Sequence, residues 1–299
     1  MAHKHDHDTE GRLSLSLLIT SVFMIGEAAG GLYTNSLALL SDAGHMFTDA
    51  FALVLSLIAA RISRWDPDRR ATFGYQRVGL LAAVINGLSL FVISFVIFFE
   101  AYRRFINPPE IKAGLMLVIA VLGLIANIVM AWILRHGHRD LNIKSAWLHV
   151  LGDTLSSAGV IISAVVIIFT GWTFADPLTS FLIGFIILFG GARVVSEASR
   201  VFLELAPRGF NVEEIAREIC AMPEVLGVHD VHLWSLTHGR ASFSAHIWVH
   251  DASLSSVQAI GEKVKRHLAD KGINHVTLEY ECAETESKGI FCELEEEED

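Results

Sequence analysis

The stretch SLALLSDAGHMFTDAFALVLSLIAA, residues 36–60, is long and apolar enough to cross a bilayer, yet Asp42, His45 and Asp49 lie inside it. A membrane-spanning helix needs about 20 mostly apolar residues. Ionisable side chains within such a helix cost at least roughly 2.5 kcal/mol each on insertion scales, and they usually mark a place where an ion is bound or moved. This stretch therefore predicts a transmembrane helix with a functional polar face.

Further apolar stretches of similar length lie on both sides of this one. The chain has 299 residues, is 52% hydrophobic and has a mean hydropathy of +0.46, which is too apolar for an ordinary soluble domain. The pattern predicts a six-helix transmembrane domain over residues 13–205, preceded by a tail at 1–12 that contains histidines. The six predicted spans are residues 13–33, 36–60, 78–99, 114–134, 146–170 and 177–195.

Basic residues predict how these helices are oriented. Lys and Arg are concentrated on the side that the N-terminus shares with the loops 61–77 and 135–145, whereas the opposite side carries Arg103, Arg104 and Lys112. The positive-inside rule then places both termini in the cytoplasm, at the plasma or inner membrane if the cell is prokaryotic. No signal peptide is expected, because the polar N-terminus leads directly into a full-length span.

A soluble domain is predicted after the sixth span, where Ala206-Pro207-Arg208-Gly209 ends the apolar run. Residues 206–282 give an α-β-β-α-β order, a small cytoplasmic α+β domain. The predicted helices cover 211–222 and 255–272, and the strands cover 228–236, 242–250 and 275–281. Residues 283–299 form an acidic tail, and the net charge of −10 argues against a nucleic-acid partner.

A His-x-x-x-Asp motif occurs twice, as His45 with Asp49 in the second span and His149 with Asp153 in the fifth. Residues four apart lie on one face of a helix, so two such faces turned towards each other bring four ligands together. Two carboxylates balance a divalent cation and two neutral imidazoles complete a tetrahedron, a set that suits Zn²⁺, with Co²⁺ or Fe²⁺ as alternatives. Asp42 has no counterpart in the fifth span and is expected to support the ligands rather than bind metal.

Other interpretations of these polar groups remain open. The motif residues could be hydrogen-bonding groups between helices, or line a hydrated crevice without holding metal. Glu27 in the first span could carry a proton, or lie in a hydrated outer vestibule. Asp176, directly before Pro177, is expected to cap the sixth helix.

Two rival functions follow from other classes of protein. An intramembrane metal hydrolase would keep an open metal position for water, whereas four protein ligands close the shell, and the chain lacks His-Glu-x-x-His; an enzyme is therefore not predicted. A membrane-tethered metal sensor would not need the paired motifs of the second and fifth spans.

Several motifs together resemble the cation diffusion facilitator family, especially its zinc-exporting branch, over nearly the whole chain. They are SLALLSDAGHMFTDA at 36–50, TFGYQR at 72–77, HVLGD at 149–153, DPLTS at 176–180 and GVHDVHLWSL at 227–236. The resemblance implies a transport site made by His45, Asp49, His149 and Asp153, a homodimer, and export driven by inward proton flow.

The same resemblance implies a zinc site in the soluble domain at the dimer interface. Its residues here are His229, His246 and Glu281, while a further ligand of some relatives is replaced by Ala259. Other nearby residues could compete for the metal, namely His232, His250, His275 and Glu279.

The expected function is divalent-metal efflux, most specifically Zn²⁺/H⁺ antiport by a homodimer that works by alternating access in a lipid bilayer. Zn²⁺ is expected as the transported substrate and as a structural ion of the soluble domain, and Cd²⁺ or Co²⁺ are further candidate substrates. Proton coupling is expected because the ligands must be free of protons to hold metal, so metal release and proton uptake are linked.

Overall fold

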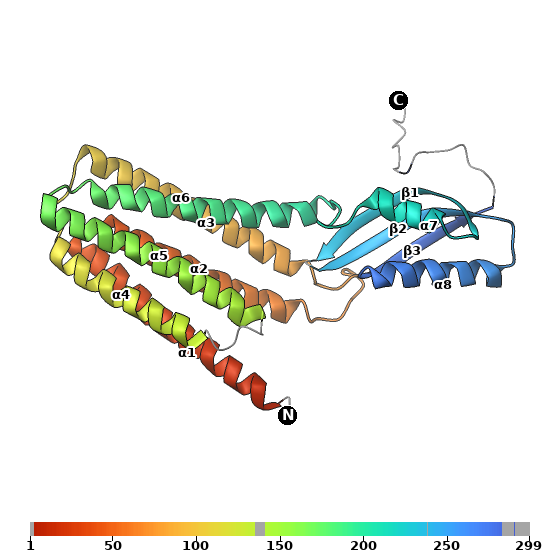
Figure 1. Cartoon of the computed structure of the whole chain (residues 1–299), viewed down its shortest axis with the longest axis horizontal. Coiled ribbons are helices and arrows are strands. Elements are labelled where there is room, and N and C mark those ends of the chain that lie inside the picture. The colour runs from red at the N-terminus through yellow and green to blue at the C-terminus, as the bar shows by residue number, and fades with distance from the viewer. Residues whose placement is uncertain (1–2, 135–140, 238, 283–289, 291–299) are drawn as a thin grey trace. The chain divides into compact units, whose positions relative to one another are not determined.

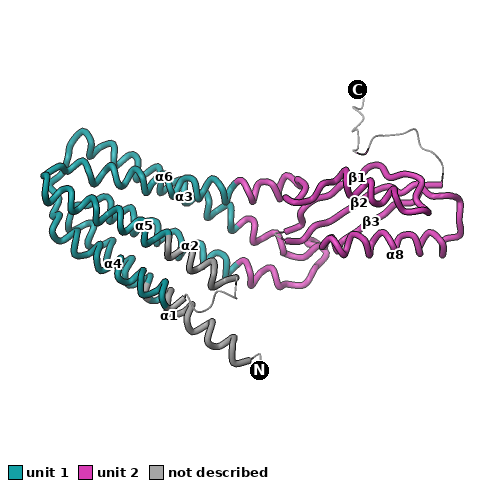
Figure 2. The backbone as a smooth tube through the Cα atoms, viewed as in Figure 1, with its two compact units in different colours: residues 1–58, 82–195 teal, residues 59–81, 196–299 magenta. Residues whose placement is uncertain are grey.

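The computed structural model describes residues 3–134, 141–237, 239–282 and 290, with side chains described throughout except at 3–17, 19, 133–134 and 141–151. Contacts divide the chain into two compact units (Figure 2). The first contains residues 1–58 and 82–195, and the second contains residues 59–81 and 196–299.

Six long helices are present, as predicted (Figure 1). In the described part of the chain, the five from α2 to α6 are long and apolar enough to span a membrane. The first helix begins at His3, ahead of the predicted span, so the helix includes described residues that were expected to form a tail. The bounds are α1 (His3–Thr34), α2 (Leu37–Ile62), α3 (Val78–Ile106), α4 (Ala113–Leu134), α5 (Leu141–Thr170) and α6 (Ala175–Phe202).

Small residues let helices of the first unit approach closely. In α3 and α6, which run side by side (Figure 1), a Cβ atom on Gly87 would lie 3.3 Å from the carbonyl oxygen of Gly191, and one on Gly191 would lie 3.1 Å from that of Gly87. Similarly, a Cβ atom on Gly30 of α1 would collide with Ile119 of α4. Membrane helices commonly associate through such close van der Waals packing, because the hydrophobic effect does not drive helices together within lipid.

The expected role of Asp176 is wrong in one respect. Helix α6 begins one residue earlier, at Ala175, and the Asp176 side chain caps the start of α2 instead of its own helix. Asp176 is fully buried and accepts hydrogen bonds from the backbone N–H groups of Leu37 and Ala38, at 2.7 and 3.1 Å. Asp176 therefore joins α6 to α2, two helices that are far apart in the sequence.

The second unit has the predicted α-β-β-α-β order. A three-stranded sheet has the strand order β1-β2-β3, in which β1 pairs antiparallel with β2 and β2 pairs parallel with β3. The parallel pair is joined through α8, as a parallel connection requires a crossover. The bounds are α7 (Val212–Cys220), β1 (Val225–Thr237), β2 (Arg240–Val249), α8 (Leu254–Asp270) and β3 (Ile273–Glu281).

One face of this sheet is covered by both short helices. Apolar residues of α7 and α8 share one core with alternate residues of the strands, and Phe243, Ala245, Ile247 and Val249 of β2 are all at most 2% exposed. The predicted inward face of β2 is confirmed. Side chains alternate along a strand, so His246 lies on the face opposite the helices.

Candidate metal sites

The paired motifs of α2 and α5 bring three ligand side chains together in the first unit. His45, Asp49 and Asp153 each offer an atom, and these atoms all lie within 4.8 Å of one another. His45 Nδ1 lies 3.5 Å from Asp49 Oδ2, and His45 Nε2 lies 4.0 Å from Asp153 Oδ1. Two carboxylates and an imidazole at this spacing can surround a divalent cation.

The fourth predicted ligand, His149, lies in α5 one helical turn before Asp153, and its side chain is outside the described part of the chain. The structure therefore brings together three of the four residues predicted for this site. Helix geometry places positions 149 and 153 on the same side of α5.

Asp42 lies one turn along α2 from His45 and is outside this group of three, although it is only 2% exposed. The Ser157 hydroxyl of α5 donates a hydrogen bond of 3.2 Å to Asp42 Oδ2. Asn127 Nδ2 of α4 in turn donates to Ser157 Oγ, also at 3.2 Å. A polar chain thus links three helices one turn away from the ligand atoms, and sequence spacing gave no sign of Ser157 in it.

A second cluster lies on the open face of the sheet in the second unit. His229 and His246 are directly opposite each other on β1 and β2, with ring centres 5.2 Å apart. Glu281 of β3 reaches both: its Oε1 lies 2.8 Å from His246 Nδ1, and its Oε2 lies 3.3 Å from His229 Nε2. The three predicted residues therefore form one group with ligand atoms close enough to hold a metal.

Two further acidic residues adjoin this cluster. Asp230 Oδ2 lies 3.3 Å and Glu279 Oε2 lies 3.6 Å from His246 Nε2. Sequence reasoning missed Asp230, because strict alternation would direct it away from His229. The pairing of β1 is irregular between His229 and His232, and Asp230 takes a left-handed backbone with φ of 50°, which Asp tolerates better than most residues.

The competing histidines have other surroundings. His232 Nε2 lies 3.1 Å from Asp230 Oδ1, and the ring of His275 packs edge-on against Phe73 with 5.4 Å between ring centres. His250 is exposed just beyond the end of β2. None of these three belongs to a described group of metal-competent ligands.

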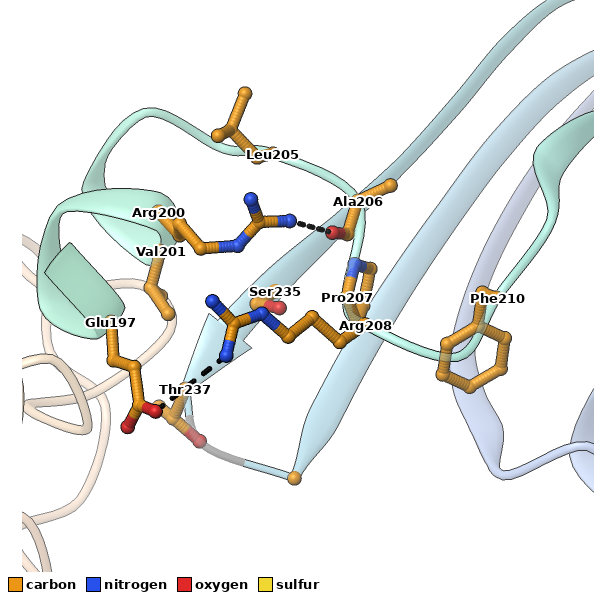
Figure 3. A pocket seen from close by; sticks show the side chains of 11 residues that line it. Glu197, Arg200, Val201, Leu205, Ala206, Pro207, Arg208, Phe210, Ser235 and Thr237 are labelled. Carbon is orange, nitrogen blue, oxygen red and sulfur yellow. Dashed lines mark hydrogen bonds and ion pairs between the residues drawn. The ribbon is translucent and has the colours of Figure 1, made fainter. Parts of the chain in front are cut away.

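A pocket in the second unit, where α6 leads towards α7, contains none of the predicted site residues (Figure 3). Its two guanidinium groups have partners within the chain. Arg200 donates a hydrogen bond to the carbonyl oxygen of Ala206, and Arg208 lies 3.7 Å from the Glu197 carboxylate. These contacts stabilise the turn after α6.

Comparison with known protein families decides the class of the protein. Residues 13–203 match the cation efflux transmembrane domain, and residues 207–282 match the cytoplasmic domain of cation efflux proteins. The chain belongs to the cation efflux family. The resemblance inferred from the motifs is therefore confirmed, and the chain is a multi-pass membrane transporter and not an enzyme.

Several curated members of this cation efflux family match nearly the whole chain. The cadmium, cobalt and zinc/H⁺-K⁺ antiporter of Bacillus subtilis (strain 168) is 40% identical, over 98% of this chain and 96% of the relative. The metal cation efflux system protein CzcD of Cupriavidus metallidurans is 41% identical, over 95% of this chain and 91% of the relative. The zinc transporter ZitB of Escherichia coli (strain K12) is 40% identical, over 94% of this chain and 93% of the relative.

Proposed function

We propose that this cation efflux protein exports Zn²⁺ in exchange for protons, working as a homodimer by alternating access. One observation carries the proposal: within the membrane helices α2 and α5, the ligand atoms of His45, Asp49 and Asp153 lie within 4.8 Å of one another. Grouped carboxylates in a membrane-spanning segment repel one another and are costly to bury. A divalent cation removes both costs, so the group fits a transported metal.

The metal we propose is Zn²⁺, with His149 as the fourth ligand. Two carboxylates cancel the charge of the ion, and imidazole nitrogens suit zinc better than they suit Mg²⁺ or Ca²⁺. The names of the relatives include zinc, cadmium and cobalt, so Cd²⁺ and Co²⁺ remain candidate substrates. The Ser157 hydroxyl, through its hydrogen bond, would hold Asp42 in place beside the ligands.

Protons are the proposed counter-ion because metal and protons compete for the same atoms. A carboxylate or imidazole must be unprotonated to bind metal. Metal release therefore favours proton uptake by the site, and proton uptake favours metal release. The name of the Bacillus subtilis relative contains both H⁺ and K⁺, and the counter-ion of that relative supports exchange rather than simple efflux.

For the rest of the chain we propose the organisation expected from the sequence. Residues 13–205 form the transport domain, residues 206–282 form a cytoplasmic domain that dimerises, residues 1–12 precede the first span and include the start of α1, and residues 283–299 are an acidic tail. Both termini lie in the cytoplasm, as the basic residues of the 61–77 loop favour. A structural zinc ion would be held in the cytoplasmic domain by His229, His246 and Glu281, whose ligand atoms are grouped.

Reconstitution into sealed vesicles tests the proposal. Purified full-length protein is placed in vesicles that contain a zinc-sensitive dye and a pH-sensitive dye, and Zn²⁺ is added outside. Zinc entry should be accompanied by loss of protons from the lumen, and a protonophore that dissipates the pH gradient should slow it. Zinc entry that is independent of pH, or that follows a K⁺ gradient alone, contradicts proton exchange; no metal entry at all favours a sensor.

A further inference from the structure

A buried carboxyl group that the transport site does not use lies in α1. Glu27 is 2% exposed, and its Oε2 atom is buried without a hydrogen-bond partner. The carboxyl group lies directly against the backbone of α4, because a Cβ atom on Gly123 would collide with Glu27 Oε1. The glycine leaves room for this carboxyl group, so Glu27 fits its place sterically, while its Oε2 atom has no hydrogen-bond partner among the described residues.

Among the described residues, the charged groups that act on Glu27 are themselves acids. They are Asp42 of α2 and Asp153 of α5. Helix α4, which packs against α1, has no charged residue between Ala113 and Leu134. Among the described side chains, an ionised Glu27 would therefore be buried without a hydrogen-bond donor or a cation, next to like charges. A proton on the carboxyl group removes both penalties.

The position of Glu27 relative to the transport site allows its protonation to respond to the charge of that site. Along α2, Asp42 is one turn nearer than His45 to the end that leads back to α1, and Glu27 interacts electrostatically with Asp42. Glu27 belongs to neither described group of metal-competent ligands. It is thus close enough to sense the charge of the transport site without being a ligand of it.

We propose that Glu27 is a proton-carrying residue of the exchange cycle, which loses its proton when metal binds at the transport site and regains it when metal leaves. This inference rests on the proposed proton-coupled function. A divalent cation cancels the charge of Asp153, one of the two acids that act on Glu27. The Glu27 O–H proton then passes to water and leaves a carboxylate, and the reverse transfer follows metal release. Linkage makes the effect reciprocal, so a proton on Glu27 weakens metal binding.

The flux ratio of protons to zinc tests this assignment. Full-length wild type, Glu27→Gln and Glu100→Gln are compared in vesicles with zinc and pH dyes. Gln keeps the size of Glu but cannot exchange a proton, so Glu27→Gln should move about one proton fewer per zinc ion, with zinc flux still measurable. Glu100 is the matched control, because it lies at the end of α3 beside Arg103 and Arg104 and should leave the ratio unchanged.

An unchanged ratio in an active Glu27→Gln protein overturns the inference. Failure of the proposed function looks different, because the wild type itself would then exchange no protons for zinc. An equal fall in the proton-to-zinc ratio of Glu100→Gln also overturns the assignment, because the Glu100 carboxylate has no proposed part in proton exchange.

A second measurement needs no variant and decides the matter if Glu27→Gln is inactive. Glu27 is the one buried Glu in the described part of the chain, so wild-type protein labelled with ¹³C at its Glu carboxyl groups can be followed by infrared difference spectroscopy. Adding Zn²⁺ at neutral pH should remove an isotope-shifted C=O band of a protonated carboxyl group. A band that persists, or a change without the isotope shift, refutes proton release from Glu27.

Discussion

Ser36 and Asp176 are 140 residues apart in the sequence, yet the Ser36 hydroxyl donates a hydrogen bond of 2.6 Å to Asp176 Oδ1. Arg104 of α3 lies 3.6 Å from the other carboxylate oxygen and also donates a hydrogen bond of 2.5 Å to the carbonyl oxygen of Asn35. One buried carboxylate therefore holds the turn between α1 and α2, the start of α6 and the end of α3 together.

Removing this carboxylate should destabilise the membrane unit. Asp176→Ala leaves buried N–H groups and the Arg104 charge without their partner, and breaking a buried charged pair costs about 3 kcal/mol or more. Ser36→Ala removes one donor and should cost about 1 kcal/mol. Chemical denaturation of the full-length protein in detergent measures both. Ser180→Ala is the control, because the Ser180 hydroxyl donates its hydrogen bond to a backbone carbonyl oxygen one turn earlier in α6 and not to the Asp176 carboxylate.

Zinc transport should depend on Asp153 more than on its neighbour Ser157. Asp153→Asn removes one of the charges that neutralise the ion, and zinc flux in vesicles should fall at least about 100-fold. Ser157→Ala removes the hydrogen bond that Ser157 donates to Asp42 and should slow transport about 10-fold. Ser163→Ala, the same substitution at a buried position of α5, should have little effect. Normal zinc transport by Asp153→Asn would show that the transport site lies elsewhere.

The selectivity of the site should change in His45→Asp. The substitution replaces a nitrogen ligand by a third carboxylate, which is harder, can bind through two oxygens and tolerates larger ions. Cd²⁺ flux should therefore rise relative to Zn²⁺ flux, measured for each metal over a concentration series. If both proteins are active and the ratio is the same, His45 does not set selectivity.

Metal binding by the cytoplasmic unit should depend on the histidines opposite each other in the sheet. His246→Ala should weaken binding of one Zn²⁺ ion at least about 10-fold in equilibrium dialysis of the full-length protein, while some zinc flux remains. His250→Ala is the matched control, because His250 is exposed beyond the end of the same strand. Equal losses in the two variants would count against a site at His246.

Acid should weaken the contact between α7 and α8. The Lys271 ammonium group, 2.7 Å from Glu218 Oε2, and then the His267 ring, 3.0 Å from the same oxygen, hold the pKa of Glu218 below its ordinary value. A lowered folded-state pKa gives stability that is present above the ordinary Glu range and is lost as pH falls through the lowered value. Glu218→Gln should thus lower the melting temperature at neutral pH but not in strong acid.

Thermal unfolding of the full-length protein across this pH range provides the measurement. The control is Glu213→Gln, an exposed carboxylate on the same helix. A melting-temperature difference between wild type and Glu218→Gln that stays constant with pH contradicts the assignment to this ionised group.

Periodic features were predictable because each depends on local geometry. The apolar alternation of β2 predicts that Phe243 and Ile247 are buried, and both are. The four-residue spacing of His45 and Asp49 predicts one helix face, and their side chains lie 3.5 Å apart. In each case the period of the backbone fixes where the side chain points.

Long-range and irregular features were not predictable from the same patterns. Asp176 has the sequence context of a cap for its own helix, but the nearest unsatisfied N–H groups belong to α2, and that proximity exists only in the folded chain. Asp230 reaches His246 because the pairing of β1 is irregular beside it, which shifts the alternation by a residue. No local propensity encodes either contact.

The facing glycines of α3 and α6 affect how a map of mutational tolerance should be interpreted. A Cβ atom on Gly87 would collide with the Val195 side chain of α6, and one on Gly191 would lie only 3.0 Å from Leu90 Cβ and 3.1 Å from the Gly87 carbonyl oxygen of α3. In a saturation screen for metal resistance, both positions should therefore reject nearly every replacement, as completely as a metal ligand would. Neither glycine has a side chain that could hold an ion. Ranked by intolerance alone, Gly87 and Gly191 would therefore be mistaken for metal ligands. The screen distinguishes packing glycines from ligands only when the abundance of each variant protein is measured together with metal resistance.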